Sequence, residues 1–189
     1  MSDLTELLDR LTHRYVSGGL HVAPETRLML YTLAVALRAE DILELGYDAG
    51  LTLEILAATG ARRVVGVDNL TEYNFVESDA QKRLEPYDNV ELFHGEAIEY
   101  LTALSNESVD FVHVDDSHER EHVYFEALQI KRVLRPGGMA VFHNDGTPHL
   151  WLVMSAFDDW GWMRFPAVSP HSGKPFDLGV VRKPMEGWL

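Results

Sequence analysis

The stretch I-L-E-L-G-Y-D-A-G occupies residues 42–50 and decides the fold expected for this chain. It begins with apolar, strand-like residues, continues through Gly46 and Gly50, and leads into residues 51–59, which have helical spacing. Glycine lets the backbone turn tightly and approach a ligand, and a helix start offers unpaired N–H donors. We therefore expect a strand, a glycine loop and a helix that could hold an anionic or zwitterionic ligand, although ordinary strand-to-helix turns share this spacing.

The next segment supports a nucleotide-type ligand. Residues 63–68, R-V-V-G-V-D, predict a buried parallel strand that ends in Asp68. In a β-α-β unit, an acid at this point lies where a ribose would offer its hydroxyls. Nicotinamide and flavin sites use G-x-G-x-x-G, whereas this chain has Tyr47 and Asp48 where a pyrophosphate would need glycine. The spacing therefore disfavours a nicotinamide oxidoreductase.

Two motifs carry a family resemblance. E-L-G-Y-D-A-G resembles the first motif of class I S-adenosylmethionine-dependent methyltransferases, in which the loop holds the methionine end of the cofactor. V-L-R-P-G-G-M-A-V-F, at 133–142, resembles the segment leading into their fifth strand. The resemblance implies an α/β fold with a doubly wound, Rossmann-like, mostly parallel seven-stranded sheet of order 3-2-1-4-5-7-6 and an antiparallel C-terminal hairpin. We expect a single methyltransferase domain over 1–189, with N-terminal helices in 1–39 and the Rossmann-like core in 40–182.

Periodicity places the remaining elements. Amphipathic stripes predict one helix from Leu4 to Tyr15 and a second after Pro24. Further strands are expected at 90–94, 109–115, from 139, at 162–165 and at 176–181. Further helices are expected at 75–84, 98–104, 123–134 and 149–159, and the R-P-G-G turn at 135–138 is expected to separate the third of these from the fifth strand.

Composition limits the partners. The 189 residues, 46% hydrophobic, suit one globular domain, and the absence of cysteine excludes disulfides and thiolate chemistry. A net charge of −14, from 16 basic and 30 acidic residues, opposes nucleic-acid binding and favours a small-molecule acceptor. Because no apolar run is of membrane-span length and the start lacks a basic signal region, we expect a soluble cytoplasmic protein without a membrane partner. A homodimer is left open.

The resemblance also implies the cofactor-binding residues. Glu96 matches the family position that commonly meets the adenine amine, although an acid there could also simply favour a helix N-terminus. The expected contacts with S-adenosylmethionine are Glu44, Gly46, Asp48, Gly50, Thr52, Asp68, Asn69, Glu96, Ala97 and Asp115.

A second set of polar residues suggests a metal. The fourth strand ends in D-D-S-H at 115–118 and the fifth in H-N-D at 143–145, and neighbouring strands lie only about 4.8 Å apart. This arrangement resembles metal-dependent small-molecule O-methyltransferases. The resemblance implies Mg²⁺ or another divalent cation on Asp115, His143 and Asn144, with His118 as the base. Because the family usually shows D-N, E-D or H-D where this chain reads H-N-D, Asp145 is a further candidate ligand.

The chemistry explains why such groups would be useful. A sulfonium donor releases a neutral leaving group, so only the acceptor hydroxyl needs help, through loss of its proton. A divalent cation would lower the pKa of that hydroxyl, and an imidazole could accept the proton. We therefore expect a methyltransferase acting on a hydroxyl of a small molecule. The alternatives are a methyltransferase that needs no metal and uses His118 or His143 alone as base, and a cofactor-binding protein without transfer activity.

Other polar and aromatic residues receive structural interpretations. Asp116 with Glu119 fits a capping box at the start of a helix. We expect His94 and His113 to be packed or hydrogen-bonded, and His122 and His149 to have no role in the site. We expect Trp151, Trp160 and Trp162 to lie in the core or the pocket wall.

Overall fold

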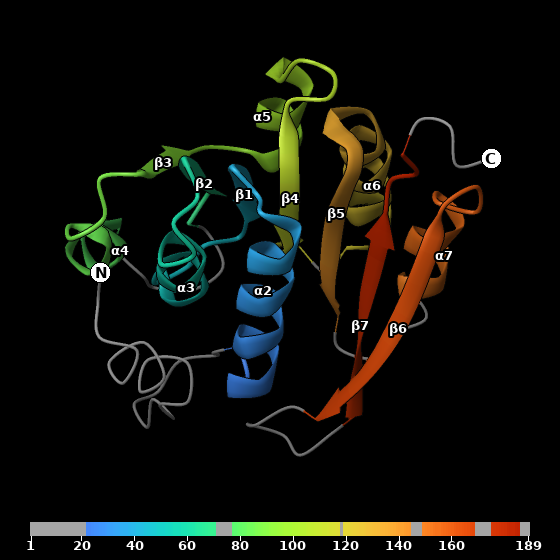
Figure 1. Ribbon diagram of the computed structural model, residues 1–189, viewed down its shortest axis with the longest axis horizontal. Helices are drawn as coiled ribbons and strands as arrows, with labels where there is room; N and C mark the ends of the chain where they lie inside the picture. Colours follow the sequence, from blue (N-terminus) through green and yellow to red (C-terminus); the bar gives the residue numbers. More distant parts are fainter. Residues whose placement is uncertain (1–21, 71–76, 118, 145–148, 169–174, 186–189) are drawn as a thin grey trace.

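The computed structural model describes residues 22–70, 77–117, 119–144, 149–168 and 175–185 (Figure 1). The helix expected near residues 4–15 lies outside these ranges. In chain order the elements are α2 (Pro24–Leu37), β1 (Asp41–Leu45), α3 (Leu51–Ala57), β2 (Arg63–Asp68), α4 (Glu77–Leu84), β3 (Val90–His94), α5 (Ala97–Ala103), β4 (Val109–Val114), α6 (Arg120–Val133), β5 (Leu134–Asn144), α7 (His149–Ser155), β6 (Gly161–Val168) and β7 (Pro175–Arg182).

The strands form one seven-stranded sheet of order β3-β2-β1-β4-β5-β7-β6. The pairs from β3 through β5 are parallel, and β7 is antiparallel to both β5 and β6. The expected fold class, strand order and terminal hairpin are thus confirmed. None of the described helices has the length and apolar character needed to span a membrane.

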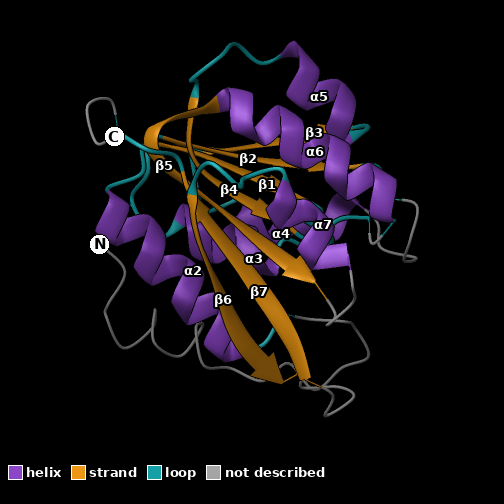
Figure 2. Cartoon of the chain, turned by 90° about the vertical axis from the view of Figure 1, so that its right-hand side faces the viewer, coloured by secondary structure: helices purple, strands orange, loops and turns teal. Residues whose placement is uncertain are grey.

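Helices cover both faces of this sheet (Figures 1 and 2). Helices α2, α3 and α4 lie on one face, and α5, α6 and α7 lie on the other. Because the crossovers are right-handed, their helices lie on one face where successive strands are added in one direction from β1, and on the other face where they are added in the opposite direction. As a result, the carboxyl ends of β1 to β5 all point to the same edge of the sheet.

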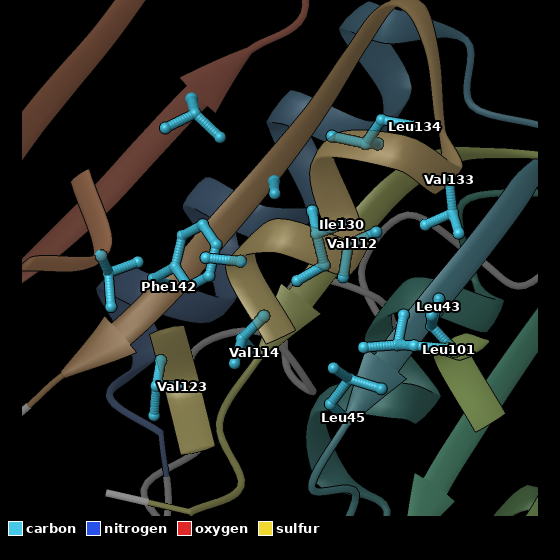
Figure 3. Close-up of a cluster of buried hydrophobic side chains, with 14 of the residues drawn as sticks. Leu43, Leu45, Leu101, Val112, Val114, Val123, Ile130, Val133, Leu134 and Phe142 are labelled. Atoms are coloured by element: carbon cyan, nitrogen blue, oxygen red, sulfur yellow. The ribbon is translucent and has the colours of Figure 1, made fainter. Parts of the chain in front are cut away.

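The core follows from side-chain alternation along the strands. In β1, Leu43 and Leu45 belong to the core under α5, α6 and α7, whereas Ile42 belongs to the core under α2, α3 and α4. Figure 3 shows the first of these cores, with Ile130 of α6 and Phe142 of β5 among its members. Because both faces are buried, most positions of these strands are apolar.

The fifth strand begins earlier than expected, although its regular pairing with β4 begins at Met139. The turn predicted at 135–138 is part of β5, which begins at Leu134 directly after α6. The N–H of Gly137 donates to the carbonyl of Lys183 (3.0 Å), and the N–H of Lys183 donates to the carbonyl of Gly138 (2.9 Å). Gly137 has φ +82°, and pairing with β4 passes from Leu134 directly to Met139, so residues 135–138 form an irregular turn within β5 and regular pairing resumes at Met139, as expected.

Helix α7 is shorter than expected, since it ends at Ser155 rather than near residue 159. The following backbone bonds, Phe157 N–H to the Met154 carbonyl at 2.9 Å and Trp160 N–H to the Phe157 carbonyl at 2.8 Å, are three-residue turns. The buried Phe157 ring packs 5.7 Å from the ring of Phe142, measured between centroids. The chain therefore leaves the α-helical conformation after Ser155, where Phe157 packs against Phe142.

Candidate functional site

A cavity of about 190 Å³ lies at the carboxyl ends of β1, β2, β3 and β4. This is the place where strand order changes direction in an open α/β sheet, and ligands bind there in such folds. The described residues that line it are Gly46, Asp48, Val67, Asp68, Asn69, Leu70, Gly95, Glu96, Ala97, Asp115, Asp116, Ser117 and His122.

Most of the cofactor residues expected from the sequence meet at this cavity. Those that line it are Gly46, Asp48, Asp68, Asn69, Glu96, Ala97 and Asp115. Three expected residues do not appear among its described lining. Gly50 is the residue before α3, Thr52 is buried inside that helix, and Glu44 is buried in β1. Their cofactor contacts stay predictions.

Glu44 contacts a histidine beneath the cavity. Glu44 and His113 are paired across β1 and β4, and the Glu44 Oε1 and His113 Nδ1 atoms lie 2.8 Å apart. Both side chains are almost fully buried, at 1% and 0% exposure. Burial raises the pKa of Glu44 despite the opposing effect of His113. The interpretation of His113 as a hydrogen-bonded interior histidine is confirmed.

Acidic side chains form the wall near the glycine loop. The Asp68 carboxylate accepts hydrogen bonds from the Asp48 N–H (2.8 Å) and the Leu70 N–H (2.7 Å). Burial, followed by the charges of Asp68 and Asp115, raises the pKa of Asp48 to about 7. The carboxylates are therefore close enough to favour a proton or a cationic ligand between them.

This raised pKa predicts a pH effect on stability without ligand. Between the ordinary value of 3.8 and about 7, folded Asp48 keeps a proton that the unfolded chain loses, so its contribution to stability falls as pH rises. Asp48→Asn removes that loss. We expect the melting temperature of Asp48→Asn, relative to wild type, to be higher at pH 8 than at pH 5, measured by thermal unfolding. The exposed Asp158→Asn variant controls for the removed charge, and an equal difference at both pH values would contradict the prediction.

Glu96, which was expected to meet the adenine amine, belongs to a group of three polar residues together with Asn69 and His94. The Asn69 side-chain amide donates to Glu96 Oε1 (3.2 Å), and His94 Nε2 lies 3.2 Å from the Asn69 carbonyl. Glu96 is the residue before α5, and its side chain makes no capping hydrogen bond there. Its carboxylate is therefore held toward Asn69 at the ends of β2 and β3.

The ends of β4 and β5 bring together two of the residues expected to bind metal. His143 Nδ1 lies 2.7 Å from Asp115 Oδ1, and both side chains are partly buried. An ionised carboxylate only accepts, so Nδ1 carries the proton and Nε2 is the basic nitrogen of the ring. His118, Asp145 and the side chain of Asn144 lie outside what the structure describes.

The capping interpretation of Asp116 was wrong, and His122, for which no role in the site was expected, lines the cavity. Helix α6 begins at Arg120 after Glu119, which makes no capping hydrogen bond with its side chain. Asp116 instead lies beside His122, with 3.3 Å between Oδ2 and Nε2, and both residues line the cavity. Local sequence rules suggested a cap because they could not show that the chain turns Asp116 toward the face of α6.

Glu126 completes this cluster and was missed. Its Oε1 lies 3.2 Å from His122 Nε2, and its side chain is fully buried. Asp116 and then Glu126 raise the pKa of His122 to about 10, while burial raises the pKa of Glu126. A sequence signal was present, because Glu126 lies on the same apolar helix stripe as Val123 and Ile130.

The family described as "Methyltransferase domain" matches residues 43–144, which include the glycine loop and the ends of β1 to β5. The chain belongs to this methyltransferase family. The resemblance to class I methyltransferases inferred from the two motifs is therefore confirmed. No curated protein sequence matches the methyltransferase significantly.

Solved structures show the same fold at low identity. The O-methyltransferase TomG from Streptomyces achromogenes, in complex with SAM, is 20% identical with a TM-score of 0.72, covering 95% of this chain and 90% of its own. The O-methyltransferase from Bacillus cereus, in complex with SAH, is 18% identical with a TM-score of 0.70, over 88% and 84%. The tRNA (m1A58) methyltransferase TrmI from Aquifex aeolicus is 16% identical with a TM-score of 0.66, over 94% and 75%. The fold of the methyltransferase is thus shared by enzymes with different acceptors.

Proposed function

We propose that this methyltransferase transfers a methyl group from S-adenosylmethionine to a hydroxyl of a small molecule. The observation that carries the proposal is an acid-lined cavity at the strand ends beside the paired Asp115 and His143. TomG and the Bacillus cereus enzyme, whose fold this chain shares, are O-methyltransferases with SAM or SAH bound. A net charge of −14 favours a small molecule over the polyanionic acceptor of TrmI.

The described lining suits each part of the cofactor. S-adenosylmethionine carries positive charge on its sulfonium and ammonium groups, and Asp48 and Asp115 supply opposite charge. Asp68, held by backbone N–H donors at 2.7 and 2.8 Å, keeps lone pairs that could accept from ribose hydroxyls. Glu96 and Asn69 would meet the adenine amine. These contacts would hold the donor and leave its methyl group on the side of β4.

On the acceptor side, the Asp115–His143 pair supplies a base. Asp115 keeps the proton on Nδ1 and stabilises the imidazolium that forms when Nε2 takes the proton of the acceptor hydroxyl. The hydroxyl oxygen then attacks the methyl carbon, and the sulfur leaves as a neutral thioether. The remaining acceleration comes from holding donor and acceptor in line.

The donor set at this place also fits a divalent cation. The Asp115 carboxylate and the His143 ring lie side by side, with 2.7 Å between Oδ1 and Nδ1, and Asn144 follows in the same strand; a bound ion would replace the proton on Nδ1. Asp115, His143 and Asn144 would hold the ion, which when bound would lower the pKa of the acceptor hydroxyl. A chelator that leaves activity unchanged would show that the Asp115–His143 pair works without metal.

Calorimetric titration with S-adenosylmethionine, S-adenosylhomocysteine and NADH, each with and without Mg²⁺, tests the cofactor. We expect micromolar binding of the two sulfur ligands and none of NADH. A screen of catechols and sugar hydroxyls with methyl-labelled cofactor then tests the acceptor class. Failure of both sulfur ligands to bind would contradict the cofactor; binding without methyl transfer to any hydroxyl compound would favour a protein that only binds the cofactor.

His143→Asn should reduce kcat about 100-fold or more, because general-base catalysis typically contributes about 10²–10⁴-fold. The affinity for S-adenosylmethionine should stay within about twofold, since His143 is absent from the described cavity lining. Single-turnover methyl transfer and calorimetry measure the two effects. A large loss in His118→Asn with little change in His143→Asn would instead assign the base to His118, as the family resemblance implies.

A further inference from the structure

Three side chains of the kinds that bind metal ions lie close together where α6 meets the loop after β4. The relevant atoms of Asp116, His122 and Glu126 all lie within 4.8 Å of one another. His122 and Glu126 are four residues apart and so share one face of α6, while Asp116 approaches from the loop. Because Asp116 and His122 line the cavity, the cluster forms part of its wall.

The separations resemble those between ligands of one ion. His122 Nε2 lies 3.3 Å from Asp116 Oδ2 and 3.2 Å from Glu126 Oε1. Yet Nε2 and both Glu126 oxygens are enclosed and make no aligned hydrogen bond with any residue that the structure describes. Ligands at about 2.0–2.1 Å from a tetrahedral metal stand about 3.3 Å apart. The two separations from His122 Nε2 thus match those between tetrahedral ligands, without the alignment of hydrogen bonds.

The charge of the cluster also favours a cation. Glu126 is 0% exposed, and an ionised carboxylate taken out of water is unfavourable unless it is paired or bound to a metal. Asp116 adds a second negative charge. One imidazolium could balance one of these charges, whereas a divalent cation balances both and leaves His122 as a neutral ligand.

We propose that Asp116, His122 and Glu126 bind a divalent cation of the zinc type. Imidazole nitrogen and carboxylate oxygen are ligands that Zn²⁺ takes, and three protein ligands leave a fourth position for water. This site is distinct from the one at Asp115 and His143, because it joins the loop after β4 to α6 rather than to β5. It does not depend on the methyl-transfer reaction.

Calorimetric titration of the full-length protein with Zn²⁺ tests the site. Wild type should bind one equivalent at the cluster, and Glu126→Gln should lower the affinity of that site at least about tenfold. Glu121→Gln is the matched control, because Glu121 is an exposed acid in the same helix. Asp115→Asn should also retain this binding. Co²⁺ in place of Zn²⁺ should give visible absorption bands of a four-coordinate ion, which Glu126→Gln should lose.

Thermal unfolding with and without Zn²⁺ provides a second measurement. Zn²⁺ should raise the melting temperature of wild type but not of Glu126→Gln. If that variant does not fold, the partly exposed His122→Gln serves instead. Failure of wild type to bind Zn²⁺, or equal affinity in wild type and the cluster variants, overturns the proposal. Zinc binding that is lost only in Asp115→Asn also overturns it and assigns the ion to the strand ends.

Discussion

Gly46→Ala is expected to lower the free energy of unfolding by at least about 3 kcal/mol. Gly46 has φ +82°, and a Cβ there would lie 2.3 Å from the Asp115 carbonyl oxygen and 2.6 Å from the Asp116 Cα. The backbone cannot move away easily, because the Gly46 N–H donates to the Val67 carbonyl and the Asp115 N–H donates to the Leu45 carbonyl, each at 2.8 Å. Urea unfolding of the variant measures the loss.

Gly60→Ala separates the two causes of this loss. Gly60 has φ +80°, nearly the same backbone conformation, but a Cβ there would have nothing within 4 Å. Its replacement should therefore cost only about 1–2 kcal/mol, the penalty of the left-handed conformation. The difference between the variants reports the clash with the loop after β4. Equal losses would mean that this loop shifts freely.

His113→Leu is expected to cost about 3–5 kcal/mol, because it leaves the Glu44 carboxyl group buried without its hydrogen-bonding partner. Glu44 and His113 are 1% and 0% exposed, and Glu44 Oε2 makes no hydrogen bond with a described residue. The loss should grow as pH rises from 5 to 8, since the leucine variant can keep Glu44 buried only by protonating it. Urea unfolding across this range measures the effect.

The double variant Glu44→Leu with His113→Leu is the control for the pair. Replacing both partners by apolar residues removes the buried charge, so much of the stability lost in His113→Leu should return. A double variant as unstable as His113→Leu would show that packing of the imidazole, rather than the unpaired carboxylate, causes the loss. S-adenosylmethionine titration of the same variants also tests the cofactor role expected for Glu44.

The sequence alone supported most of the fold because its signals are local or periodic. Val90–His94 was expected as a strand and is β3, and the helix expected after Pro24 is α2. The strand order came from the family resemblance carried by the glycine loop. Local rules failed where distant contacts decide the neighbours of a side chain, as at Asp116, which was expected to cap a helix but lies beside His122.

Gly46 also shows what the sequence could predict and what only the tertiary structure reveals. The glycine was expected to allow close approach of a ligand, and it does line the cavity. The closest atoms to its missing side chain, however, belong to the backbone of Asp115 and Asp116. Spacing in the sequence could identify the glycine but not the neighbour that requires it.

The sequence by itself determined the methyltransferase family, the alternating strands and helices, and the acids at the strand ends, because these follow from motif spacing and hydrophobic period. Only the tertiary structure decided which polar groups meet. Asp115 contacts His143 because β4 and β5 are neighbours, and Asp116 meets His122 and Glu126 because the chain turns back onto α6. Side-chain partners far apart in sequence depend on packing of the whole sheet, and no local pattern contains that information.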